Sequence, residues 1–214
     1  TTPEMLKLLE RVRKVANGAA IMTETEVTDS ILAAVSNILP NDPLCDAMQR
    51  NLDMVGPPSF EKEDYAYADN FTKTFSVDDI DESYKRVGIV RAEDTSLANF
   101  VVPKGVAPQS LGGSTDVGDV SWVVPTVQLW GGNYAIGTPF HSWQMVAQGK
   151  SAMAYKGMTH AASVMAATAV DVILDQDLRN NALADLKNKV GLDGYICPLL
   201  KGSTPPIKAM GGTL

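Results

Sequence analysis

The chain has 214 residues, of which 45% are hydrophobic and 20% are charged, and this composition is ordinary for a globular protein. Its formal net charge of -7 at pH 7 argues against nucleic acid as a partner, because no excess of basic residues is present to neutralise phosphates. No apolar run reaches the roughly 18 residues that a membrane-spanning helix needs, and no secretory signal pattern opens the sequence.

Residues 1–38 are predicted to form a helix followed by a strand. Thr2 is a candidate N-cap, Pro3 suits the first helical position, and Asn17-Gly18 is typical of a helix end. A β-prone run over residues 21–38 then indicates a strand. One helix and one strand bury too little apolar surface to be stable alone. We therefore predict that residues 1–38 are part of a domain, and the start at Thr1 rather than methionine favours a fragment or a processed chain.

The next fifty residues are predicted to contain three helices. Asp42 is expected to cap the first helix, with Pro43 at its first position, and Ser59 to cap the second. The acidic run at residues 78–82 lacks the ligand spacing and central glycine of a calcium loop. A helix start exposed to solvent is the better interpretation of that run. Residues 88–109 contain several prolines and glycines and are predicted to form a surface loop.

Residues 110–141 are the stretch most typical of a functional site. A glycine-rich turn opens it, and an apolar run over residues 120–130 follows, which predicts a buried strand. A second turn, Gly131-Gly132, leads into a loop that ends at His141, one of only two histidines in the chain. Functional side chains cluster in loops at the ends of strands. Trp122, Trp130 and the nearby Trp143 are expected to be core residues rather than an aromatic substrate box, and Trp143, two residues after His141, is the one for which a substrate role stays open.

Two helices are predicted after this stretch. Residues 149–174 are rich in alanine and methionine, which indicates a long buried helix, and residues 175–190 form a second helix that Gly191 ends. His160 lies inside the first of them, so we expect it to be packed and hydrogen-bonded. Residues 195–214 contain several prolines and glycines and are predicted to be an extended tail.

Three blocks of the sequence carry a resemblance to a known family: residues 112–122, residues 137–144, and the helix at residues 156–162. The chain resembles the C-terminal part of the metal-dependent amidohydrolases of the aminoacylase and carboxypeptidase G type. The resemblance implies an α/β fold in two parts. Residues 39–214 would be the C-terminal part of a zinc-exopeptidase-like α/β sandwich, and residues 1–38 half of a ferredoxin-like lid or dimerisation domain.

His141 is the strongest candidate for chemistry. It follows a rigid loop, and a neutral imidazole binds zinc and related ions well. On residue chemistry alone a structural histidine remains an equal alternative. The resemblance implies that His141 binds one metal of a two-metal centre holding zinc or manganese. The general base and the other ligands are not identifiable in this sequence, so no catalytic residue is assigned.

The glycine-rich turn is predicted to bind substrate or to support the metal loop. The residues that share this expectation are Gly112, Gly113, Ser114, Thr115, Asp116 and Asp119. The glycines could present backbone amides to a substrate carboxylate. For Asp116 the alternative is a turn aspartate that bonds local backbone amides. Asp119 is the weaker candidate of the two carboxylates.

The resemblance also implies the reaction and the partners. Two metals would generate a hydroxide and a glutamate would act as general base, so that the amide of an N-acyl amino acid, most specifically p-aminobenzoyl-glutamate, is cleaved. One histidine cannot hold two metals, so we expect the isolated chain to be inactive. A homodimer or heteromer through the lid is expected.

Cys45 and Cys197 lie far apart and indicate free thiols in the cytoplasm. The alternative function is a non-catalytic subunit or interaction domain that keeps the fold without metal.

Overall fold

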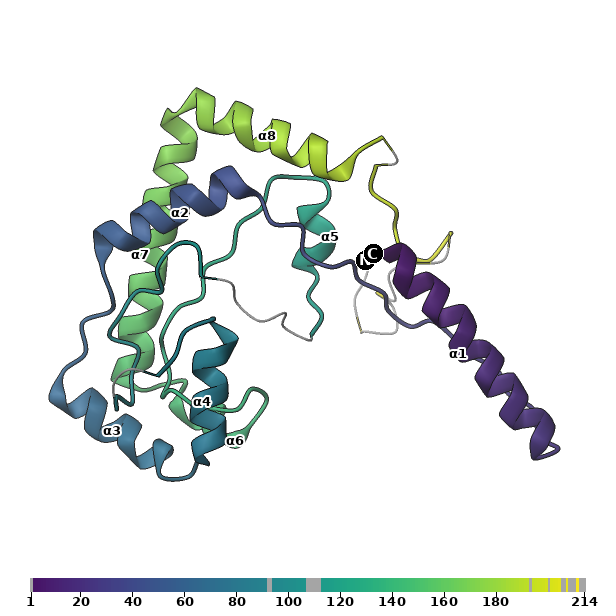
Figure 1. Cartoon of the computed structure of the whole chain (residues 1–214), viewed down its shortest axis with the longest axis horizontal. Helices are drawn as coiled ribbons and strands as arrows, with labels where there is room; N and C mark the ends of the chain where they lie inside the picture. Colours follow the sequence, from purple (N-terminus) through teal and green to yellow (C-terminus); the bar gives the residue numbers. More distant parts are fainter. Residues whose placement is uncertain are drawn as a thin grey trace. The chain divides into compact units, whose positions relative to one another are not determined.

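The computed structural model describes residues 2–91, 94–106, 113–192, 194–199, 201–204, 207 and 211. All regular secondary structure within these residues is helical (Figure 1). The helices are α1 (Thr2–Met22), α2 (Asp42–Val55), α3 (Lys62–Thr72), α4 (Val77–Arg86), α5 (Val117–Ser121), α6 (Trp143–Gln148), α7 (Ala152–Leu174) and α8 (Gln176–Val190).

The predicted fold class, an α/β sandwich preceded by half of a ferredoxin-like lid, is wrong, because the described part of the chain contains no strand. Helix α1 continues past Asn17-Gly18, so the run at residues 21–38 begins inside this helix. After a turn, the rest of the run has no regular secondary structure. The run at residues 120–130 begins in α5 and continues as irregular backbone. A strand requires a ladder of hydrogen bonds to a neighbour. Neither run has such a neighbour among the residues described.

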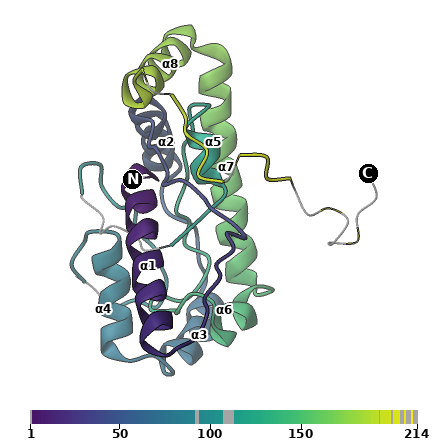
Figure 2. The same ribbon diagram turned by 90° about the vertical axis from the view of Figure 1, so that its right-hand side faces the viewer.

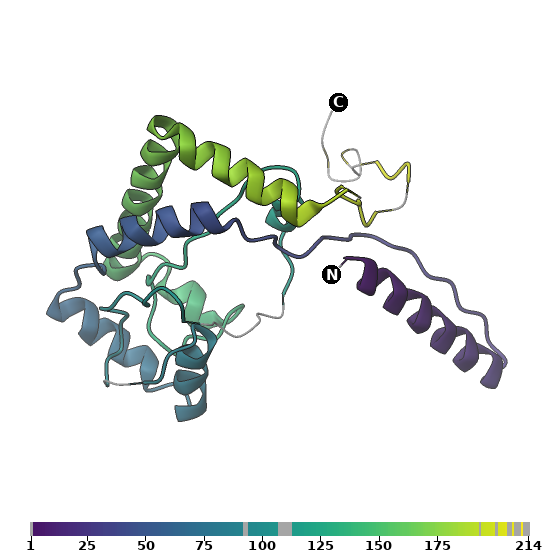
Figure 3. The same ribbon diagram turned by 45° about the horizontal axis from the view of Figure 1, so that its top comes forward.

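The chain divides into two compact units. The first unit contains Thr1–Pro40, Gly113–Thr126 and Leu186–Leu214, and the second contains Asn41–Gly112 and Val127–Asp185. In the first unit, the chain leaving α1 runs back beside that helix (Figures 2 and 3). Arg13 of α1 donates two hydrogen bonds to Asp29, and Thr2 contacts Ser36 across 3.2 Å between their hydroxyl oxygens. Polar contacts therefore tie the returning segment to α1 at two points, the start and the middle of the helix.

The apolar residues of α1 are largely exposed. Leu8, Val12, Val15, Ile21 and Met22 all present more than half of their surface to solvent. The apolar residues do lie at helical spacing, as predicted, but few other described residues pack against their side chains. The helical periodicity was therefore sufficient to predict the helix and did not by itself identify a buried face.

The core of the second unit consists of two apolar clusters. In one, Leu44 and Ala47 of α2 pack against Leu178 and Ala182 of α8. In the other, α3 and α7 pack on the loops between them, through Ala68, Leu97, Ala135 and Met153. Trp130 and Trp143 are 54% and 64% exposed, so the prediction that they are core residues is wrong.

Helix α2 is fixed at its start and along its length by asparagines. Asn41, not Asp42 as predicted, is the N-cap: its side-chain oxygen accepts from the Leu44 amide, and its nitrogen donates to the Ala182 carbonyl at 2.9 Å. Asn51 donates from α2 to Asp171 of α7 at 2.7 Å. These bonds orient α2 against α7 and α8, because each satisfies a polar group that packing removes from water.

Helix α7 is long and apolar enough to cross a membrane by length and composition alone. It carries Lys156, His160 and Asp171, and it is bonded to α2 through Asp171. Only a minority of its most apolar stretch is buried, and Ile173 and Leu174 are 70% and 77% exposed. The predicted helix is confirmed, but the prediction that it is buried is wrong because one side has no cover within the described residues.

Asp64 is the buried carboxylate that holds the start of α3. It is 3% exposed, accepts from the Glu61 amide at 2.9 Å, and pairs with the Lys156 ammonium at 2.5 Å. Burial works to raise the pKa of Asp64, but these two interactions outweigh it, and the pKa lies below its usual value. Ser59, which the sequence predicted as the cap of this helix, lies before its start.

Replacing Asp64 with asparagine is expected to lower the free energy of unfolding by about 2–3 kcal/mol at pH 7, since it leaves Lys156 without its buried partner. The folded-state pKa of Asp64 is depressed, so its contribution is fully present above the unfolded value of about 3.9 and is lost as the pH falls through the folded-state pKa. Denaturant unfolding of wild type and Asp64→Asn at several pH values measures this. The control is Asp69→Asn, an exposed position on the same helix. A difference that stays constant down to the lowest pH would contradict the assignment.

Candidate functional site

His141 lies at the end of a loop that enters α6, and its side chain is exposed. Its backbone adopts a φ of 57°, in the left-handed region that few non-glycine residues occupy. Such strain persists only where the surrounding structure imposes it, and it concentrates at functional sites. His141 lies in a loop, as the sequence predicted. Its backbone conformation must be held by the residues around it.

Gln148 of α6 holds the backbone on either side of His141. Its side chain is 1% exposed. Its oxygen accepts from the Ala135 amide at 2.7 Å, and its nitrogen donates to the Thr138 hydroxyl and the Gln144 carbonyl, both at 3.0 Å. Ser142 closes the other side of the loop, because its hydroxyl donates to the Pro139 carbonyl at 2.7 Å. One buried amide thus holds both ends of the segment that presents His141.

Gly137 lets this loop pass close to α4. Its φ is 94°, and a Cβ there would lie 2.8 Å from the Ile80 Cγ1 and 3.0 Å from a ring carbon of Phe75. Its amide donates to the Ser83 hydroxyl of α4 at 3.1 Å. Any larger residue would have to displace α4, so the loop and α4 form one fixed arrangement.

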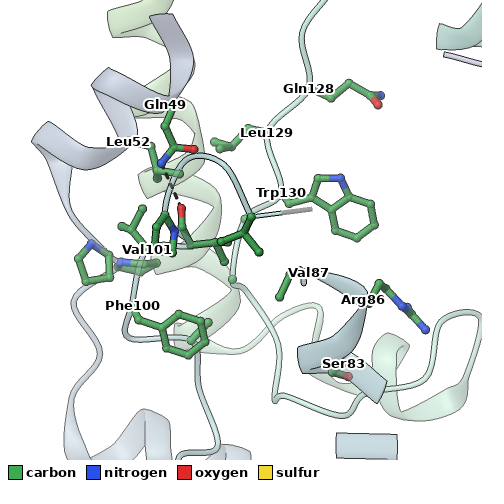
Figure 4. A pocket seen from close by; sticks show the side chains of 18 of the residues that line it. Gln49, Leu52, Ser83, Arg86, Val87, Phe100, Val101, Gln128, Leu129 and Trp130 are labelled. Carbon is green, nitrogen blue, oxygen red and sulfur yellow. Dashed lines mark hydrogen bonds between the residues drawn. The ribbon is translucent and has the colours of Figure 1, made fainter. Parts of the chain in front are cut away.

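A cavity of about 540 Å³ lies in the second unit, beside the same loop. Gly137, Thr138 and Phe140 contribute to its wall, while His141 does not. Figure 4 shows Arg86 and Trp130 on one side of the cavity and Phe100, with its apolar neighbours, on the other. Gln49 donates to the Val102 carbonyl at 3.2 Å, which holds the loop that carries Phe100 against α2. The cavity is therefore built from α2, α4, α7 and the loops that follow residues 97 and 127.

Phe140 is the centre of an aromatic group at the Arg86 side of the cavity. Its ring centroid lies 6.1 Å from those of both Trp130 and Tyr134, and the Arg86 guanidinium carbon lies 4.7 Å above the ring. Burial raises the pKa of Tyr134, and the nearby Arg86 charge partly offsets that rise. Tyr134 therefore stays neutral at physiological pH, and Arg86 is the charge of this group.

His160 is packed and hydrogen-bonded, which confirms the prediction for the second histidine. Its Nε2 lies 2.6 Å from the Gly56 carbonyl oxygen, so Nε2 must carry the hydrogen and donate. Its Nδ1 is buried and has no hydrogen-bond partner among the described residues. His160 is also one of the residues that line the cavity.

The glycine-rich turn lies in the first unit, whereas His141 lies in the second. Gly112 lies outside the described residues. Gly113, Ser114 and Asp116 are exposed, and the Thr115 hydroxyl accepts from the Val117 amide at 3.3 Å. Asp116 precedes α5, but its side chain makes no capping hydrogen bond. The alternative role for Asp116, bonding local backbone amides, therefore finds no support at the helix start.

Asp119 connects three segments of the first unit. It accepts from the Ser36 amide at 3.2 Å and from the Tyr195 hydroxyl at 2.8 Å. Burial works to raise the pKa of Asp119, but these hydrogen bonds outweigh it and lower the pKa; burial and Asp119 together raise the pKa of Tyr195. Gly118 is needed for this contact, because a Cβ there would lie 1.9 Å from the Ser36 carbonyl oxygen. Asp119 thus anchors α5 to the segments around it.

The described residues contain no group of three or more histidine, cysteine, aspartate or glutamate side chains that could hold a metal ion. A stable zinc site uses three or four protein ligands. His141 thus lies outside any such group among the described residues, and its role as a metal ligand stays a prediction.

Sequence reasoning missed two residues of this region, Gln148 and Arg86. Gln148 lies just before the helix predicted at residues 149–174, and nothing in the neighbouring sequence marks it as buried. Arg86 lies in the last turn of α4, where a basic residue is explained by the helix dipole alone. The role of each residue depends on contacts with residues distant in sequence, and a local sequence pattern does not reveal such contacts.

The chain is similar to a subunit of the p-aminobenzoyl-glutamate hydrolase of Escherichia coli (strain K12), with 38% identity over 220 residues. The alignment covers 96% of this chain and 46% of the relative, so the chain spans about half the length of the curated relative it matches. This confirms the resemblance predicted from the three sequence blocks. No family model matches the chain, and no solved structure matches it.

Proposed function

We propose that this chain supplies part of the active site of an amidohydrolase that cleaves N-acyl amino acids, with p-aminobenzoyl-glutamate as its substrate. The similarity to a hydrolase of that name over nearly the whole chain is the observation that carries the proposal. Because the chain spans 46% of that relative, the activity belongs to an assembly larger than the residues described. Residues 39–214 would contribute to the catalytic domain, and residues 1–38 to a lid or dimerisation domain.

In this proposal His141 is one ligand of a divalent metal, zinc or manganese. An exposed imidazole can reach a ligand position, and the bonds of Gln148 and Ser142 fix the loop that carries it. Fixed ligands bind metal more tightly because little ordering is required when the ion arrives. When bound, the two metals would supply a Lewis acid and an activated water. The remaining ligands and the general base come from outside the described residues.

The exposed turn at Gly113, Ser114, Thr115 and Asp116 is the proposed place for contact with the substrate carboxylate. Its backbone amides are accessible, and backbone amides of glycine turns bind anions. Asp119 would support the turn from behind, through its bonds to Ser36 and Tyr195. The role of these residues is thus to orient substrate, not to move protons.

The relative is named as one subunit of its hydrolase, which supports a partner chain, and the exposed apolar residues of α1 would lie where residues 1–38 meet it. A homodimer or a heteromer is consistent with this surface. Within the described residues Cys45 and Cys197 are exposed and form no disulfide, and this supports the cytoplasmic location that we propose.

The hydrolysis assay tests the proposal directly. The assembled enzyme that contains this chain is expected to release p-aminobenzoate and glutamate from p-aminobenzoyl-glutamate, and the 214-residue chain alone to release neither, because its described residues lack a complete set of ligands. Product formation is followed by absorbance, with N-acetyl-amino acids as competing substrates. An assembled enzyme without activity on any of these amides would overturn the proposal and favour a non-catalytic interaction subunit.

A further inference from the structure

The cavity of the second unit has the size and lining of a small-molecule site. Its volume of about 540 Å³ falls within the range of about 300–1,000 Å³ that ligand sites occupy. Its wall is largely apolar, with Leu52, Phe100, Val101 and Leu129 among the side chains that face it (Figure 4). A ligand that fills it therefore presents an apolar or aromatic body to this wall.

Arg86 carries a positive charge in the wall of the cavity, and no acidic side chain among the described residues pairs with it. The lining contains one other cation, Lys104, which is paired with Asp46 at 2.8 Å. No ion pair or hydrogen bond joins the Arg86 guanidinium to any residue within the described ranges, where it lies over the Phe140 ring. The five N–H donors of the guanidinium are thus available to a ligand.

The side chains around Arg86 determine which anion suits it. Half-burial among aromatic rings lowers the local dielectric, so an anion there is attracted more strongly than in water. The planar guanidinium matches a carboxylate through two parallel hydrogen bonds. In Figure 4, Arg86 and Trp130 lie across the cavity from Phe100, which separates the charged side from the apolar side.

We propose that this cavity binds an amphiphilic carboxylate, with the acidic group at Arg86 and an aromatic or apolar body against Phe100 and Val101. This inference goes beyond the proposed function, because neither His141 nor the turn at residues 113–116 lines the cavity.

Binding of 2-naphthoate and of its neutral isostere 2-naphthamide to the 214-residue chain tests the proposal without any need for hydrolysis. By isothermal titration calorimetry, the carboxylate is expected to bind at least tenfold more tightly than the amide. Arg86→Met should remove this difference and leave the amide affinity within twofold. Lys104→Met is the matched control, because it removes a cation of the same wall that already has a carboxylate partner, and it should preserve the difference.

Circular dichroism and thermal melts of each variant show whether the fold is kept. If Arg86→Met does not fold, Arg86→Lys replaces it: the charge is retained but the two-bond geometry is lost, and the tenfold preference should fall to about threefold. Equal affinity for carboxylate and amide in the wild type, or a preference that survives in the Arg86 variant, would overturn the proposal. Loss of amide hydrolysis in the assembled enzyme with this preference intact would instead count against the proposed function alone.

Discussion

Replacing His141 with glycine in the assembled enzyme is expected to reduce turnover of p-aminobenzoyl-glutamate by more than about 100-fold, the upper figure for losing a residue that only supports a metal ligand. The fold should survive, because an exposed imidazole contributes no core packing. Glycine accepts a φ of 57° without strain, so thermal stability should be equal to or slightly above that of the wild type. Steady-state kinetics and thermal melts on the same samples measure both effects.

Two further variants separate the imidazole from the backbone. His141→Ala removes the imidazole but keeps the strained conformation, and His141→Asn places there a residue that tolerates it. All three substitutions should lose activity to the same extent, while the melting temperature should be lowest for alanine. Lys150→Ala, an exposed change just after α6, is the control. If activity changed in proportion to stability across the three variants, and did not depend on the presence of the imidazole, the proposal that His141 is a metal ligand would be wrong.

Replacing Gln148 with methionine is expected to lower the free energy of unfolding by about 2–4 kcal/mol. Methionine has nearly the same shape, so the loss comes from three hydrogen bonds and from the Ala135 amide that is left buried without an acceptor. Turnover should fall as well, because the His141 loop is no longer held at both ends.

Denaturant unfolding of Gln148→Met beside Gln144→Met measures this effect. Gln144 lies on the same helix and contributes its backbone carbonyl, not its side chain, to the cluster, so its substitution should cost less than about 0.5 kcal/mol. Equal stabilities for the two variants would show that Gln148 does not hold the loop. A destabilised Gln148 variant with full activity would show that His141 does not depend on the loop for its position.

The longer helices were predictable because their signals are local, whereas the short helices α5 and α6 were not predicted. The acidic run that begins α4 is a helix start, as expected, and Ser76 caps it by accepting from the Asp79 amide at 3.1 Å. The predicted ends of α8 agree with the structure within a residue, because the apolar periodicity stops at Gly191. These features depend on a few neighbouring residues, so the sequence alone contains them.

The strands and the cavity were not predictable in this way. Residues 21–38 and 120–130 have strand-like composition, but a strand also requires a neighbour that supplies its hydrogen bonds, and the described residues provide none. The loop position of His141 was predicted from its glycine and proline neighbours. Gln148 and Arg86 were missed because their roles come from contacts with residues distant in sequence, such as Gln148 with Ala135 and Arg86 with Phe140.

The metal content of the assembled enzyme, with and without His141, tests the central claim most directly. After dialysis against metal-free buffer and reloading with zinc or manganese, elemental analysis should give two metals per wild-type active site. His141→Gly should retain about one fewer, because the ligand is lost while the fold and the remaining ligands persist. Equal metal content in the two proteins would contradict the assignment of His141 as a metal ligand.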